Sequence, residues 1–207
     1  MATAAGTISG HSYWNSGWIP SGSSTYGATS SQTCYAGGTH PYVLKFTVPS
    51  VSGNLSAATL TFTLFAVKAS ASSATVNYRI SASGKDGSTN TVPSGLVSGS
   101  VTFSSLTASG YQGSFTTTAV NLTAGGTYYL WLHGGTTFQA YKHASYYSVT
   151  LNYAAYTACG APTSCSVSST LAEGNVTLSW SGANSGTNNT ISSYEIQYSE
   201  SSNNSAW

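Results

Sequence analysis

The chain has 207 residues, a formal net charge of +1, and only 4% charged residues. Average soluble domains carry about 25% charged residues, and helices take Lys, Glu and Arg for their solvated faces. The composition therefore argues against helical domains and against nucleic-acid binding, which needs a basic surface. Because 40% of the residues are hydrophobic and 13% aromatic, we expect a folded chain built from strands.

The first 40 residues are rich in turn formers and aromatic side chains but show no extended alternation. We expect residues 1–40 to form a loop-rich arm that packs on the domain that follows and adds one or two edge strands. Its aromatic residues Tyr13, Trp14 and Trp18 would dock on that domain or on a neighbouring subunit. Alternatively, they form a second candidate ligand surface.

Strand patterns recur over residues 41–155, separated by Gly, Ser, Asn and Pro clusters. For example, Leu60, Phe62 and Leu64 alternate with threonines, which is typical of a half-buried strand. The predicted strands are residues 42–48, 58–67, 74–82, 96–103, 113–122, 127–133, 136–141 and 146–154. About eight such strands without helical periodicity predict an all-β domain, with a jelly-roll-like antiparallel β-sandwich as the first choice.

The pattern changes after a predicted linker, residues 156–164, and we expect a second domain in residues 165–207. This region resembles the start of a fibronectin type III domain, with a Pro before the first strand, a Trp ending the second and Tyr-x-Ile-x-Tyr in the third. The residues that carry the resemblance are Pro162, Trp180, Tyr194, Ile196 and Tyr198. Because such a sandwich takes roughly seven strands, the resemblance implies a truncated fibronectin type III (Ig-like) sandwich.

Few side chains of residues 1–172 can support catalysis. Asp86 is the one carboxylate among them, whereas a glycosidase needs a pair and a Ser-His-Asp triad would need the same aspartate. The histidines and Cys34 show no metal-ligand spacing. We therefore expect no enzyme, no cofactor and no metal site. We expect the cysteines to be reduced, with a bridge between Cys159 and Cys165 left open.

The strand at residues 127–133 places Tyr129, Trp131 and His133 on one face. The simplest interpretation is a central strand buried on both sides. The alternative is an aromatic platform on which sugar rings stack, extended by side chains one hairpin away. The candidate glycan-binding residues are Tyr129, Trp131, His133, Tyr141, His143 and Tyr146.

In composition and domain order, the chain resembles bacteriophage tail-fibre and minor tail proteins. This resemblance implies a non-catalytic structural or adhesive virion protein that binds copies of itself, other virion proteins and a host surface glycan, with no nucleic-acid or membrane partner. The start "MATAAGTISG" lacks the basic and apolar regions of a secretory signal. A virion assembled in the host cytoplasm and released by lysis would need none. The alternatives are a carbohydrate-binding module of a secreted bacterial enzyme, and a bacterial surface adhesin or filament subunit.

Overall fold

The computed structural model describes residues 1–13, 18–20, 33–85, 90–141, 146–156, 164–167, 178–181 and 186. The chain divides into two compact units, Met1–Ala154 and Ala155–Trp207. All regular elements of the described residues are strands, and every described strand pair is antiparallel. The predicted all-β antiparallel fold is confirmed. Within the described part of the chain, no helix is long and apolar enough to cross a membrane.

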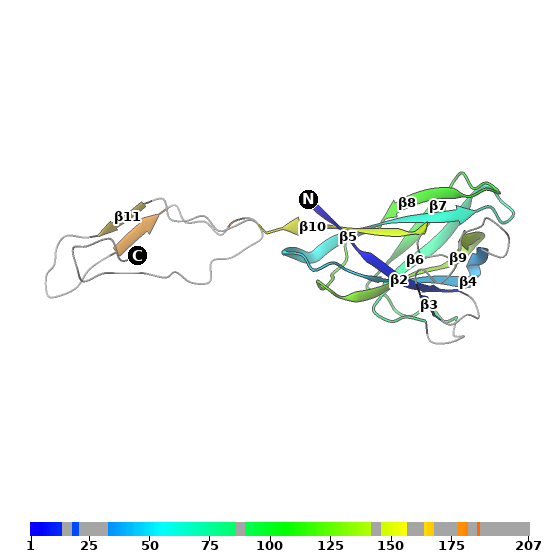
Figure 1. Ribbon diagram of the computed structural model, residues 1–207, viewed down its shortest axis with the longest axis horizontal. Helices are drawn as coiled ribbons and strands as arrows, with labels where there is room; N and C mark the ends of the chain where they lie inside the picture. The colour runs from blue at the N-terminus through cyan, green and yellow to red at the C-terminus, as the bar shows by residue number, and fades with distance from the viewer. Residues whose placement is uncertain are drawn as a thin grey trace. The chain divides into compact units, whose positions relative to one another are not determined.

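The first unit is a ten-stranded antiparallel sheet that curls into a β-sandwich (Figure 1). Its strands are β1 (Ala2–Ala5), β2 (Thr7–Ser12), β3 (Ile19–Pro20), β4 (Thr33–Thr47), β5 (Gly53–Val67), β6 (Ala74–Ser81), β7 (Val97–Phe103), β8 (Tyr111–Thr116), β9 (Thr127–Tyr141) and β10 (Ser148–Ala155). One layer has the strand order β7-β6-β9-β4-β2-β3, and the other has the order β8-β5-β10-β1.

Apolar side chains from both layers meet in one core. On β5 the predicted alternation holds, since Leu60, Phe62 and Leu64 are buried and the threonines between them are half-buried. The ring of Phe62 contacts the ring of Phe46 from β4 edge to face, with centroids 5.3 Å apart. Because β4 and β5 belong to opposite layers, this pair joins the two layers. Burying such a side chain contributes about 1.5–3 kcal/mol.

The strands β4 and β9 run as a pair from one layer into the other. Inside the first layer, residues Tyr42 to Thr47 of β4 pair with β9. Toward its C-terminal end, β9 also pairs with β5 of the second layer. Between these segments the register shifts twice, and the glycines there take left-handed angles, with φ of 79° at Gly37 and 65° at Gly135. Strands that change layers commonly do so through such bulges.

Two sequence predictions are wrong where β4 and β9 pass from one layer to the other. Residues 127–133 and 136–141 belong to one strand, β9, because the "GG" at 134–135 makes a bulge and not a hairpin turn. Likewise β4 begins at Thr33, inside the predicted arm, and continues through Pro41. The proline fits there because it falls between Gly38 and Tyr42, where the ladder is irregular and its missing N–H removes no regular bond.

The predicted arm and one predicted strand also differ from the structure. The arm contains β1, β2 and β3 as well as the start of β4, so it is an integral part of the sheet. The strand predicted at residues 113–122 ends earlier, since β8 stops at Thr116. Beyond it, Val120 forms an isolated antiparallel bridge with Ala58. Thr117 is buried there, and its hydroxyl accepts a bond from the Leu60 amide at 3.0 Å.

In the second unit the structure describes one antiparallel pair, β11 (Ser164–Val167) with β12 (Leu178–Ser181), in which Cys165 lies opposite Trp180. The other residues that carry the fibronectin resemblance lie outside the described residues, as does Cys159. The fibronectin type III resemblance, the linker at 156–164 and the open Cys159–Cys165 bridge therefore stay predictions.

Candidate functional site

A set of polar side chains lines the outer face of the first layer. In the β6–β9 ladder, Asn77 lies opposite His133 and Arg79 lies opposite Trp131. In the β6–β7 ladder, Asn77 lies opposite Ser100 and Arg79 lies opposite Ser98. Side chains of directly opposed residues share a face of the sheet. The pairings thus gather Arg, His, Asn and Ser side chains from neighbouring strands onto one surface.

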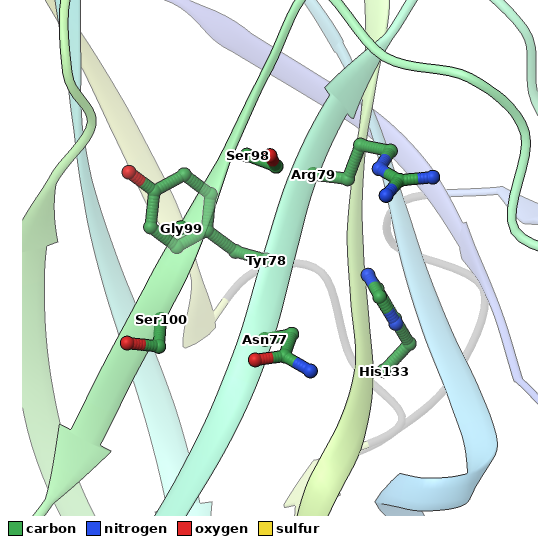
Figure 2. Close-up of a pocket in the computed structure, with 7 residues that line it drawn as sticks. All are labelled: Asn77, Tyr78, Arg79, Ser98, Gly99, Ser100 and His133. Carbon is green, nitrogen blue, oxygen red and sulfur yellow. The ribbon is translucent and has the colours of Figure 1, made fainter.

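These residues surround an open hollow of about 340 Å³, the β6–β7–β9 hollow (Figure 2). Its lining residues are Asn77, Tyr78, Arg79, Ser98, Gly99, Ser100 and His133. Tyr78 is buried and belongs to the core. Gly99 leaves room for the Tyr78 ring, because a Cβ at position 99 would lie 2.6 Å from the Tyr78 hydroxyl. The polar groups of the hollow therefore come from the other residues.

Arg79 is the cation of the hollow. Its side chain is half-buried, and Nη1 donates a hydrogen bond to the carbonyl oxygen of Pro93 at 2.7 Å. The described ranges contain no Asp or Glu, so within them no carboxylate neutralises this guanidinium. Figure 2 shows the guanidinium of Arg79 and the imidazole of His133 extended to the same side of β6.

His133 stands beside Arg79 with an unsatisfied polar atom. Its Nε2 is buried and makes no hydrogen bond in the structure. Burial lowers the pKa of the imidazole below the ordinary value of 6.5, and the positive charge of Arg79 lowers it further. The ring is therefore neutral at neutral pH, which lets it donate from one nitrogen and accept at the other.

The lowered pKa predicts an acid-sensitive contribution of His133 to stability. Above about pH 6.5 the ring is neutral in both the folded and unfolded states. As the pH falls from there toward the folded pKa, only the unfolded chain gains the proton, so stability falls. We expect the urea midpoint of the wild type to fall more between about pH 8 and about pH 5 than the midpoint of His133→Gln. An equal change in urea midpoint between the two pH values for both proteins would contradict the lowered pKa of His133.

The structure corrects one residue of the predicted aromatic platform. Trp131 is 1% exposed, and its indole Nε1 donates to the carbonyl oxygen of Ser83 at 3.1 Å. Its ring is therefore not offered to a ligand. At this position the simplest interpretation, a central strand buried on both sides, is correct and the platform interpretation is wrong.

Tyr129 and Trp18, predicted as parts of separate surfaces, lie together. Their ring centroids are 5.3 Å apart, with the planes at 45°. Tyr129 is half-buried, and Trp18 is 39% exposed. Gly84 accommodates both rings, since a Cβ there would clash with each of them. The outer face thus carries a small aromatic pair, made by Tyr129 and Trp18.

Tyr13 docks on the sandwich, as one of the two interpretations of the arm predicts. It packs against the core, its ring stacks with His11 at 6.3 Å, and its carbonyl oxygen accepts a 2.8 Å hydrogen bond from Lys85 Nζ. Lys85 is itself buried, and burial lowers its pKa below 10.5.

Of the remaining predicted site residues, the structure describes the side chain of Tyr146 alone. Tyr146 packs against Phe65 of β5, with ring centroids 5.3 Å apart, and so belongs to a different aromatic contact. Tyr141 pairs through its backbone with Thr33 at the end of β9, while its side chain lies outside the described residues. Trp14 and His143 also lie outside them. In the described ranges, no three His, Cys, Asp or Glu residues gather as a metal site.

Sequence reasoning missed Asn77, Arg79, Ser98 and Ser100. A signal was present, because the alternation that buries Val76, Tyr78 and Ile80 places Asn77 and Arg79 on the opposite face of the same strand. Arg79 is also the single arginine of the chain. What the sequence did not show is that β7 and β9 flank this face.

No protein-family model matches the chain, and no curated protein matches it. Among solved structures, the chain is similar to the K3 cleaved adhesin domain of Lys-gingipain from Porphyromonas gingivalis w83. The identity is 16%, and the match covers 72% of this chain and 99% of that chain, with a TM-score of 0.35. A likeness at this TM-score transfers neither fold nor function.

Proposed function

We propose that this chain is a non-catalytic adhesive protein that binds a surface saccharide in the β6–β7–β9 hollow. The observation that carries the proposal is the convergence of polar side chains from adjacent strands on one open hollow. Amide, hydroxyl and imidazole groups supply both donors and acceptors, which the hydroxyls of a sugar require. Strands of a packed sandwich hold such groups more rigidly than loops do.

The setting that composition and domain order favour is a bacteriophage tail or surface appendage, in which the chain contacts copies of itself and other virion proteins. The outer face of the second layer supports such contacts because it is neutral and rich in hydroxyls. Thr61 bonds Thr116 and Thr63 bonds Ser114, each at 2.9 Å between hydroxyl oxygens. Light scattering of the full chain at high concentration should show association, and a strictly monomeric chain would count against the virion setting.

Saccharide binding is tested by removing polar groups of the hollow without changing its charge. In a screen of the full chain on a glycan array, we expect retention on at least one saccharide. The double variant Asn77→Ala and Ser100→Ala should weaken that binding at least ~tenfold, since a hydrogen bond contributes about 1 kcal/mol. The matched control, Ser70→Ala with Ser72→Ala, removes hydroxyls from two exposed residues that do not line the hollow and should bind like the wild type.

Two outcomes would contradict the proposal. One is no retention on any saccharide of the array. The other is an equal loss of binding in the control with Ser70→Ala and Ser72→Ala, which would show that the hollow is not the binding site.

A further inference from the structure

We infer that the saccharide bound in the β6–β7–β9 hollow is a sugar acid, whose carboxylate is held by Arg79 and His133. This inference rests on the proposed function and assigns the chemical class of its ligand. It follows from the charge of the hollow, from the free edge of the guanidinium, and from the unsatisfied imidazole nitrogen.

The charge of the hollow favours an anion. Arg79 is permanently protonated, half-buried, and without an Asp or Glu partner in the described ranges. Placing a charge partly out of water is costly unless it is paired. The guanidinium also disfavours a proton on neighbouring His133. A bound carboxylate would relieve both effects, and the protein supplies no negative group of its own within the described residues.

The geometry of Arg79 suits a carboxylate. Nη1 donates its hydrogen bond to the Pro93 carbonyl oxygen. The side edge of the guanidinium, formed by Nε and Nη2, is then the edge that a ligand can use. That edge presents parallel N–H groups that match the spacing of carboxylate oxygens. The stem of the side chain packs closely on Gly95, where a Cβ would clash with it. The guanidinium is therefore positioned before the ligand arrives, which lowers the entropic cost of binding.

The other polar groups indicate a sugar rather than a bare anion. The Nε2 atom of His133 is buried and unbonded although the residue lines the hollow, so a small turn of the ring toward a ligand would give this nitrogen a hydrogen bond without breaking one to the protein. The amide of Asn77 and the hydroxyls of Ser98 and Ser100 are exposed along the same hollow and can bond the ring hydroxyls. The volume of about 340 Å³ lies near the lower end of small-ligand sites, which suits a terminal sugar.

Pairs of polymers that differ only in the acid group test the inference. The probes are immobilised polygalacturonate, alginate and hyaluronate, each beside its carboxyl-reduced, neutral form. We expect the full chain to bind at least one acidic form at least ~tenfold more tightly than its reduced partner, as expected for a charge-assisted contact. Arg79→Gln should remove this preference, and Arg79→Lys should retain only part of it because lysine lacks the planar fork.

A matched control separates a local site from general attraction. Lys68→Gln removes one positive charge from an exposed residue that does not line the hollow, and it should keep the wild-type preference. If Arg79→Gln alters the circular dichroism spectrum, Arg79→Lys and His133→Gln carry the test, and both must reduce the preference for the acidic form.

The outcomes distinguish this inference from the function on which it rests. Dextran sulfate is the probe for a sulfated ligand. Equal binding to acidic and reduced forms, or binding to dextran sulfate and to none of the carboxylated polymers, overturns the sugar acid while saccharide binding stands. An equal loss of preference in Lys68→Gln also overturns it. Failure to bind any saccharide overturns both.

Discussion

Trp131→Ala should lower the free energy of unfolding by about 3 to 5 kcal/mol. Although Trp131 faces outward from the sheet, its ring is 1% exposed and its Nε1 bonds the carbonyl oxygen of Ser83. Truncation would leave a cavity beneath the segment around Ser83 and deprive that carbonyl of its donor. The effect should appear as a lower urea midpoint of the full chain, followed by far-ultraviolet circular dichroism.

Trp18→Ala provides the matched control. Trp18 lies on the same outer face, but it is 39% exposed and its main described contact is the ring of Tyr129. Its loss should cost only about 0.5–1.5 kcal/mol. A Trp131→Ala variant no less stable than Trp18→Ala would show that Trp131 is not buried in solution and would restore it as a candidate platform residue.

Gly135→Ala should destabilise the sandwich by about 3 kcal/mol or more, because strain and a backbone clash add. Gly135 has a φ of 65°, which an L side chain adopts at a cost of about 1–2 kcal/mol. In addition, a Cβ at this position would clash with the carbonyl oxygen of Thr75 on β6. Because β6 is part of the sheet, the clash can be relieved only by displacing a paired strand.

Gly125→Ala isolates the strain from the clash. Gly125 has a similar φ of 71°, but the nearest atom to its Cβ would be Ser50 Oγ at an ordinary 3.5 Å. We expect a loss of about 1–2 kcal/mol there. The difference between the urea midpoints of the two variants measures the clash. Equal midpoints would mean that β9 does not approach β6 so closely at Gly135.

Strands dominated by local alternation were predicted well. The predicted strand at 74–82 corresponds to β6, Ala74–Ser81, and the one at 96–103 to β7, Val97–Phe103. In β6, side chains alternate between core and surface, so the period-two pattern is present in the sequence itself. Where the sequence contains glycines and a proline, as around residues 37–41, local signals favour a turn. The strand β4 exists there because β9 lies beside it.

The candidate site shows the same division between local and long-range information. Alternation correctly places Tyr129, Trp131 and His133 on one face. The face of each residue follows from its position alone, because every second side chain of a strand points to the same side. Whether each residue is exposed depends on distant segments: Trp131 is bonded by Ser83, 48 positions away, and Trp18 contacts Tyr129. Arg79 emerged as a site residue only once β7 and β9 were placed beside it.

The pairing of β1 with β10 determines how the first unit bears mechanical load. Ala2 lies opposite Tyr153 and Ala5 opposite Thr150 in an antiparallel ladder, so the chain enters and leaves this unit at neighbouring points. Tension applied through both ends would open the β1–β10 hydrogen bonds one after another, like a zipper. Tension between the β6–β7–β9 hollow and the end of β10 would instead load the pairing of β10 with β5 and the packing between the two layers.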